Sequence, residues 1–317
     1  MRVCLMVEGQ EGVSWGDWVA LAGACERAGL EGLFRSDHYL SVVGFRERES
    51  LDAWATLAGL AAKTERIRLG TLVSPATFRH PSVLAKTVAT VDHISGGRVE
   101  LGLGAGWNEP EHAAYGFPFP QLGERMEMLA EQLEIVRRVW TEEDVTFEGR
   151  HYRLGGCPAL PTPVQRPCLP IIVGGSAGPR SIALAVRFAD EYNTLLASVE
   201  DCRERKERLV AACGRAGRDP ATLPLSLMAT CVVGESRAQV VERARAILRV
   251  WGAGDQDPEA VLADRGERWV AGTPDEAVAR IRALADAGVE RVYLQHLAPQ
   301  DVETVALLGD VARAVAE

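Results

Sequence analysis

Short runs of apolar residues alternate with longer amphipathic segments along almost the whole chain. The first apolar run, 2–7, predicts a strand, and the segment after it predicts a helix that begins at the N-cap Ser14 and ends at Gly29. Seven further strands are predicted at 31–35, 67–73, 99–103, 169–173, 191–195, 225–233 and 291–297. Strands that alternate with helices in this way favour a single α/β domain of the (β/α)8 TIM-barrel type, and a doubly wound open sheet is the alternative.

Helices are predicted between these strands, and three insertions interrupt the alternation. The helices span about 50–63, 81–94, 121–140, 201–215, 237–251, 274–288 and 301–316, and one more begins after Gly178. The insertions lie at about 108–120, 141–169 and 252–270. The first has the prolines and aromatics of a partly ordered active-site loop and is expected to contain one helical turn. The second contains a β-hairpin at 144–154, and the third is expected to have some helical content. No linker separates these parts, so 1–317 is predicted to form one domain.

Polar, aromatic and glycine residues gather where the predicted strands end. In parallel α/β folds the chemistry lies beyond the carboxyl ends of the strands, because loops can vary there without disturbing the packed sheet. The residues that follow strands two, three and four are Ser36, Asp37, His38, Ser74, Pro75, Thr77, Arg79, Ala105, Gly106, Trp107, Asn108 and Glu109. We therefore expect the active site at this edge, centred on the stretch 67–112.

Several of these side chains suit a chemical role, and each also has an ordinary structural explanation. His38 is placed to transfer a proton, although a lone histidine beside Asp37 often only supports the fold. Trp107, next to glycines, is either the wall of a site for a flat ligand or a core residue. Glu109 and Glu111 are either candidate carboxylates or exposed loop charges. The histidines do not pair at metal-ligand spacing, so no metal site is predicted and a metal-dependent hydrolase is poorly supported.

Two glycine-rich stretches follow predicted strands. In the first, GLGAG at 102–106, the third glycine is misplaced for a dinucleotide fingerprint, so these glycines are expected to let the backbone approach a flat ligand or a neighbouring strand. The second, GGSAGPRS at 174–181, lies between a strand and the start of a helix. Its backbone N–H groups, the helix dipole and Arg180 favour a phosphate site over an ordinary turn.

The composition narrows the possible partners and the compartment. The formal net charge is −9 and the pI is about 5.3, so no nucleic-acid partner is expected. No apolar run approaches the roughly 18–20 residues of a membrane span, and the first apolar run is too short for a secretory signal. The seven cysteines include no CxxC pair, which indicates a reducing cytoplasm.

Nearly the whole chain resembles the luciferase-like monooxygenase superfamily, in its branch of actinobacterial oxidoreductases that use coenzyme F420. The segments that carry the resemblance are SDH at 36–38, LGTLVSPATFRHPSVLAK, ATVDHISGGRVELGLGAGWNEPEH, GGSAGPRS, ADEYN and GTPDEAVARIRALADAGVERVYLQHL. Together, and in this order, they are specific for the family.

The resemblance implies that the deazaflavin of F420 lies across the carboxyl-terminal mouth of a TIM barrel. The third strand of such proteins carries a bulge with a non-prolyl cis peptide behind the ring, which places that peptide at Leu72–Val73 or Val73–Ser74. The cofactor contacts implied in this way are Ser36, Leu72, Val73, Ser74, Ala105, Gly106, Trp107, Gly174, Gly175, Ser176, Ala177 and Gly178. The resemblance also implies catalytic roles for His38 with Asp37 beside it.

The fourth strand departs from one part of the family. F420-dependent sugar-phosphate dehydrogenases carry a catalytic glutamate directly after the fourth-strand glycine, where this chain has Trp107. Glu109 is then a displaced substitute at best, and the sugar-phosphate dehydrogenase role is in doubt.

The leading hypothesis is F420-dependent hydride transfer to or from a small, uncharged or weakly polar organic molecule, with one proton supplied by His38. The first alternative keeps the fold and uses FMN and oxygen as a two-component monooxygenase. The second alternative is a non-catalytic flavin- or deazaflavin-binding protein. The resemblance also suggests a homodimer and a separate cofactor reductase.

Overall fold

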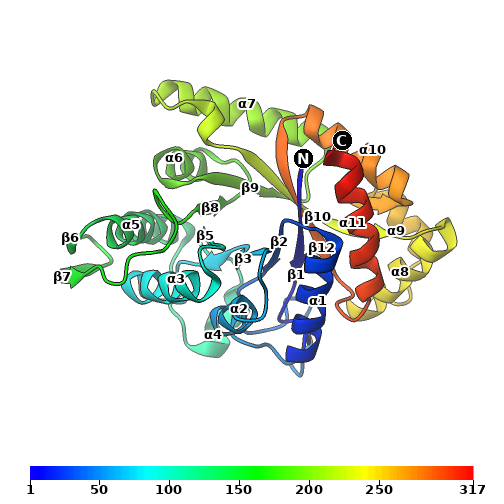
Figure 1. Ribbon diagram of the computed structural model, residues 1–317, viewed down its shortest axis with the longest axis horizontal. Coiled ribbons are helices and arrows are strands. Elements are labelled where there is room, and N and C mark those ends of the chain that lie inside the picture. The colour runs from blue at the N-terminus through cyan, green and yellow to red at the C-terminus, as the bar shows by residue number, and fades with distance from the viewer. Residues whose placement is uncertain (317) are drawn as a thin grey trace.

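The strands of the computed structural model, which describes residues 1–316, form a closed parallel barrel surrounded by helices (Figure 1). Around the barrel the order is β1 (Arg2–Val7), β2 (Gly32–Arg35), β3 (Arg68–Thr71), β5 (Val99–Gly104), β8 (Ile171–Gly174), β9 (Glu191–Leu195), β10 (Leu225–Val233) and β12 (Val289–His296), which pairs with β1 again. The short β4 (Ser74–Pro75) pairs with β5, and β11 (Val270–Gly272) pairs with β10. The predicted TIM barrel is therefore confirmed, and the open sheet is excluded.

Helices cover the outside of the barrel in the order in which they follow the strands (Figure 1). They are α1 (Trp15–Ala28), α2 (Ala53–Ala61), α3 (Pro81–Ser95), α4 (Glu109–Tyr115), α5 (Leu122–Thr141), α6 (Pro179–Phe188), α7 (Val199–Arg215), α8 (Arg237–Val250), α9 (Pro258–Arg265), α10 (Pro274–Asp286) and α11 (Val302–Ala316). A 3-10 turn at Pro220–Thr222 and the antiparallel hairpin of β6 (Asp144–Glu148) and β7 (Arg153–Pro158) complete the chain. The hairpin confirms the one predicted in the second insertion.

Side-chain caps fix the helix ends that the sequence signals. The Ser14 side chain accepts from the backbone N–H of Asp17, the Asp17 carboxylate accepts from the Ser14 N–H, and Gly29 closes α1 in the left-handed conformation. Thr273 and Glu276 form the same reciprocal cap at the start of α10. Both predicted helix starts are confirmed.

Three boundaries differ from the sequence prediction. The strand predicted at 67–73 is interrupted after β3 by a cis peptide at Leu72–Val73, and its remainder forms β4. The helix predicted at 50–63 begins only at Ala53, because the Asp52 side chain accepts from the N–H of Ala55 and caps it there. The helix α9 lies in the third insertion and agrees with the helical content expected there, whereas the strand β11, which begins at the end of that insertion, was not predicted.

The barrel interior is apolar in its middle and charged near the amino ends of the strands. Tyr293 and Phe34 meet edge to face, with ring centroids 4.9 Å apart, in a cluster that fills the interior. Beneath it the buried guanidinium of Arg291 lies 2.7 Å from a carboxylate oxygen of Glu100 and 3.3 Å from one of Glu191. Burial alone raises the pKa of Glu100, but the charges of Arg291 and Arg68 lower it to about 2.

Among the residues that the structure describes, no helix is both long enough and apolar enough to cross a lipid bilayer.

The buried cluster predicts an acid-sensitive contribution to stability. Because the folded pKa of Glu100 lies below its ordinary value of 4.5, its contribution is fully present above that value and is lost as the pH falls toward about 2. Glu100→Gln should destabilise the protein at pH 7 by about 3 kcal/mol, since Arg291 loses a buried partner, and should flatten the loss of stability below pH 4.5. Urea unfolding followed by circular dichroism measures both effects.

The matched control is Glu142→Gln, which removes the exposed partner of Arg138 on α5. It should change the free energy of unfolding far less, because exposed ion pairs contribute little. Equal stability of Glu100→Gln and the wild type across this pH range would contradict the assignment.

Candidate functional site

The carboxyl ends of the barrel strands meet at one end of the barrel, which we call the mouth. The register places Val7 beside Arg35, Arg35 beside Thr71, and Gly174 beside Asn193, so the loops that follow these strands start at the same level. Ser36–His38, Trp107 and the loop Gly174–Gly178 therefore lie around one opening, as the sequence predicts.

His38 is held at the mouth by a carboxylate that comes from the first insertion. Its Nδ1 lies 2.7 Å from Oε2 of Glu111, a residue of α4 with no exposed surface. The other oxygen of Glu111 accepts from the backbone N–H groups of Tyr39 and Leu40, at 2.5 and 3.2 Å. These bonds fix the loop after β2 to α4 and leave His38 Nε2 without a hydrogen-bond partner within residues 1–316.

The pairing of His38 with Glu111 shifts the pKa of each residue in the direction that favours its charged form. Burial alone lowers the pKa of His38, but the hydrogen bond and charge of Glu111 raise the pKa above its ordinary value of 6.5. Burial alone raises the pKa of Glu111, but His38 and the two backbone N–H groups lower it. Trp107 and the imidazole are arranged edge to face with ring centroids 5.6 Å apart, and 64% of Trp107 is exposed. The mouth thus presents a positioned imidazole with a raised pKa beside an exposed indole.

Asp37 does not reach the mouth surface, contrary to the role that the resemblance implies for it. Its two oxygens lie 2.5 and 3.2 Å from the Arg79 guanidinium, and Oδ2 also accepts from Ser74 Oγ at 2.6 Å. Arg79 binds Asp52 as well, at 2.8 Å. Trp54 Nε1 donates to Ser74 Oγ at 3.1 Å. Asp37 and Ser74 are buried, so this cluster holds the segment after β3 against the loop after β2 beneath the surface of the mouth.

Val73, half-buried at the start of the segment after the cis peptide, lies against glycines of two neighbouring strands. A Cβ added at Gly102, Gly104 or Gly174 would stand 3.0, 2.8 or 3.1 Å from a Val73 side-chain carbon. These three positions therefore have no room for a side chain, because Val73 packs over the ends of β5 and β8 there. The cis peptide at Leu72–Val73 is the one that the resemblance implies. The result is a small, apolar platform without side chains on its flanks, which fits the face of a flat ring.

The loop Gly174–Gly178 has the form of an anion site. The N–H groups of Gly175 and Ala177 are bonded within the protein, to the carbonyl of Asn193 at 3.0 Å and to the hydroxyl of Tyr192 at 2.8 Å. Within residues 1–316, the N–H groups of Ser176 and Gly178 have no such partner, and no side chain caps α6. Free N–H groups at a helix start attract a phosphate or carboxylate, so the residues present fit the predicted phosphate site.

Other predicted residues lie at the mouth without meeting His38. Ser36 is buried and donates to Gln10 Oε1 at 2.5 Å, so it joins two loops and is not open to a ligand. Ala105 is half-buried, and Gly106 has a φ of 80°, with Thr77 Oγ1 2.9 Å from any added Cβ. Glu109 is exposed at the start of α4 and makes no hydrogen bond to His38 in the described chain. The residue that binds the histidine is Glu111, two positions further on.

Sequence reasoning also missed Glu8, which follows β1 at the mouth. Its carboxylate accepts from Gln295 at 2.6 Å and from Gln10 at 2.9 Å, and its charge adds to the raised pKa of His38. The signal available was only its position at the end of the first strand. His112, by contrast, is buried and bonded on both ring nitrogens, to the Asn108 carbonyl and to Thr77 Oγ1 at 2.7 Å each, which is a structural role.

Comparison with known proteins identifies the family of the chain. The family model described as luciferase-like monooxygenase matches residues 3–291. The F420-dependent hydroxymycolic acid dehydrogenase of Mycobacterium tuberculosis is 33% identical over 303 residues, which cover 91% of this chain and 81% of that protein. An uncharacterized protein of the same organism is 38% identical over 174 residues, 55% of this chain, and the match spans only 60% of that relative. Among solved structures, an F420-dependent secondary alcohol dehydrogenase with a bound F420–acetone adduct superimposes with a TM-score of 0.85, at 21% identity, covering 100% of this chain and 99% of that one.

The pairing of His38 with Glu111 predicts that His38 and His296 titrate at different pH. His38 should keep its proton to above pH 6.5, whereas burial lowers the pKa of His296 to about 4. Glu111→Gln should lower the pKa of His38 and leave that of His296 unchanged, because only the charge beside His38 is removed. Imidazole 15N chemical shifts of histidine-labelled protein report each titration.

The sign of the linkage follows from the raised pKa. The pair stabilises the fold fully between the ordinary values of Glu111, 4.5, and His38, 6.5. The contribution of His38 is lost as the pH rises through its raised pKa, and that of Glu111 is lost as the pH falls through its lowered pKa. A wild-type His38 that titrates at or below 6.5, or that is indifferent to Glu111→Gln, would refute the pairing.

Proposed function

Because the chain belongs to the luciferase-like monooxygenase family, we propose that it is a coenzyme F420-dependent oxidoreductase that transfers a hydride to or from a small organic molecule. The observation that carries the proposal is His38, held by the buried Glu111 at the same end of the barrel as the Val73 platform and the loop Gly174–Gly178. The names of the dehydrogenase relatives support the choice of F420.

The residues at the mouth match the parts of such a cofactor. The N–H groups of Ser176 and Gly178 would hold its phosphate, and Val73 with the ends of β5 and β8 would support its ring. When bound, reduced F420 supplies a hydride and oxidised F420 accepts one. The role of the protein is then to orient the ring, to exclude water and to donate or accept one proton.

His38 is the group that would manage the proton. Its Nδ1 is occupied by Glu111, which leaves Nε2 for the oxygen atom of a substrate. A raised pKa favours the protonated imidazole, the form that can give a proton to the oxygen of a carbonyl during reduction. In the opposite direction, neutral His38 would take the proton of an alcohol. Glu111 acts through His38 and is a positioning residue.

The exposed side chains at the mouth favour an apolar or weakly polar substrate. Trp107, Leu195 and Leu196 are 64%, 46% and 37% exposed. Leu195 is the last residue of β9 and Leu196 follows it, at the same end of the barrel as His38. Large apolar side chains exposed at the same end of the barrel as a proton donor suit a ketone, an enone or a secondary alcohol better than a sugar phosphate.

The family name itself favours one alternative, an FMN-dependent two-component monooxygenase on the same barrel. A platform and an anion loop would serve FMN as well as F420. The homodimer and the separate cofactor reductase suggested by the resemblance stay predictions.

A paired titration distinguishes these functions. Purified apoprotein should bind F420 at least about tenfold more tightly than FMN, a difference of about 1.4 kcal/mol, as measured by cofactor fluorescence. The opposite preference would move the protein to the oxygen-using branch. Tight binding of F420 without turnover on panels of ketones, enones and secondary alcohols would instead support a non-catalytic binding protein.

His38→Gln should separate proton transfer from binding. We expect turnover with F420 to fall by about 10²- to 10⁴-fold, while the dissociation constant of F420 changes by less than about threefold. The control is His93→Gln, which alters an exposed histidine on α3 whose ring Nε2 lies 2.8 Å from the Thr162 carbonyl. If His38→Gln keeps wild-type turnover, the assignment of the proton donor is wrong.

A further inference from the structure

Two polar side chains continue the apolar interior of the barrel toward the mouth. On β12 the interior residue Tyr293 is followed two positions later by Gln295, and on β10 Met228, which packs on the same interior cluster, is followed by Thr230. Side chains two positions apart on a strand lie on the same face, so Gln295 and Thr230 point into the barrel as well. Thr230 Oγ1 donates to Gln295 Oε1 at 2.6 Å, and both residues are buried. They form a polar layer between the apolar cluster and the mouth.

The carboxylate of Glu8 completes this polar layer. Glu8 follows β1, on which Cys4 and Met6 belong to the interior cluster. Its Oε1 accepts from Gln295 Nε2 at 2.6 Å, so its side chain points inward too. Val73, which forms the platform, packs on the same cluster. Glu8 therefore lies at the same open end of the barrel interior as the platform.

Two buried amides direct their N–H groups at this carboxylate. Gln10, which has no exposed surface, donates from Nε2 to Glu8 Oε2 at 2.9 Å, and its Oε1 accepts from Ser36 Oγ at 2.5 Å. Gln295 is held in the same way, with its oxygen on the Thr230 hydroxyl and its N–H on Glu8. The reverse orientation of either amide would place an amide oxygen against the carboxylate. Glu8 is thus fixed in position by neutral groups.

The Glu8 carboxylate keeps room for a further hydrogen-bond donor. Within residues 1–316 its side chain accepts only from the two amides and forms no ion pair. A carboxylate can accept about four hydrogen bonds, and Glu8 is half-buried, so a ligand in the mouth can reach it. The charge of Glu8 also contributes to the raised pKa of His38, so the two groups lie near each other.

A carboxylate accepts hydrogen bonds and donates none, which limits what it can bind. The oxygen of a ketone has only lone pairs and is repelled by Glu8, so it belongs at His38 Nε2. The group beside Glu8 is then a donor elsewhere on the same molecule. An ammonium group would be repelled by the protonated His38 nearby, whereas a hydroxyl group donates without adding charge.

We propose that Glu8 selects substrates that carry a hydroxyl group in addition to the carbonyl or carbinol that reacts, namely hydroxyketones and diols. This inference rests on the proposed function. In the reduction the carbonyl carbon takes the hydride, the carbonyl oxygen takes the proton of His38, and Glu8 accepts a hydrogen bond from the second hydroxyl without exchanging its proton. Glu8 is thus a binding residue, and His38 stays the proton donor.

The test compares hydroxyacetone and the hydroxybutanones with acetone and butanone. Binding to the protein without cofactor is followed by the imidazole 15N shift of His38, and turnover of the F420-loaded enzyme gives kcat/KM for each compound. The variants are Glu8→Gln, which removes the charge, and Glu8→Asp, which keeps the charge and withdraws the carboxylate by one methylene. The matched control is Glu235→Gln, an exposed glutamate that follows β10 at the same end of the barrel. Circular dichroism shows whether each variant is folded.

In the wild type the hydroxyketones should bind and react better than the plain ketones by about ten- to a hundredfold, as expected for a hydrogen bond to a charged group. Glu8→Gln and Glu8→Asp should each reduce this preference to less than about threefold, and Glu235→Gln should leave it unchanged. The ratio of the two kcat/KM values does not depend on the protonation of His38, because the same imidazole serves both substrates.

A Glu8 that only raises the pKa of His38 would give a different result. Glu8→Gln would then lower kcat/KM for both kinds of ketone and leave their ratio unchanged, which would overturn the binding role. A wild type that shows no preference for hydroxyketones in either measurement would overturn it as well, and both results leave the F420 function standing. If F420 itself does not bind, the proposed function fails, and the His38 shifts still show whether Glu8 prefers hydroxyketones.

Discussion

The arrangement of the mouth depends on one buried carboxylate. Glu111 has no exposed surface, and a buried charge is tolerated only when it is paired and hydrogen-bonded. It meets that requirement through His38 and the backbone of Tyr39 and Leu40, all in the loop after β2. The first insertion, which carries Glu111, and the loop that carries His38 are therefore held together by the same bonds that orient the imidazole.

The charged residues at the two ends of the barrel have different roles. At the amino ends of the strands, Arg291 is surrounded by carboxylates and shielded from solvent, so its role is to balance the charge of the buried carboxylates. At the mouth, the ion pair of Asp37 with Arg79 lies beneath the surface and fixes two loops. His38 differs from both, because one of its nitrogens has no partner in the described chain. An unused nitrogen on a fixed ring is what proton transfer to a ligand requires.

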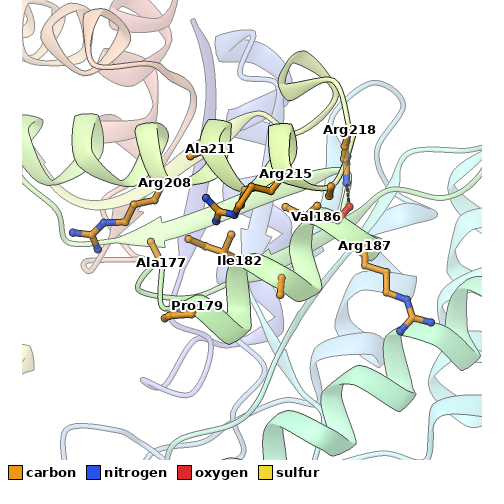
Figure 2. Close-up of a pocket in the computed structure, with 12 residues that line it drawn as sticks. Ala177, Pro179, Ile182, Val186, Arg187, Arg208, Ala211, Arg215 and Arg218 are labelled. Carbon is orange, nitrogen blue, oxygen red and sulfur yellow. Dashed lines mark hydrogen bonds between the residues drawn. The ribbon is translucent and has the colours of Figure 1, made fainter.

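The sequence predicted the fold well and the details of the site less well, for physical reasons. Helix starts at Ser14 and Thr273 depend on a few adjacent residues, so their caps are readable. The interruption of the third strand at Leu72–Val73 was indicated only by the resemblance to a family. The pairing of His38 with Glu111 joins residues 73 positions apart, and nothing local distinguishes Glu111 from the exposed Glu109. Likewise, Arg187 of α6, Arg208 and Arg215 of α7 and Arg218 just after α7 line one groove only after the two helices pack (Figure 2).

We propose that F420 lies across the mouth with its phosphate on the loop Gly174–Gly178 and its ring between Val73 and His38. A crystal structure of the protein with bound F420 would show whether it does. The phosphate should lie within hydrogen-bonding distance of the N–H groups of Ser176 and Gly178, and the ring should contact the Val73 side chain and the His38 imidazole. Density for the cofactor elsewhere on the barrel, or a ring that does not touch His38, would contradict it.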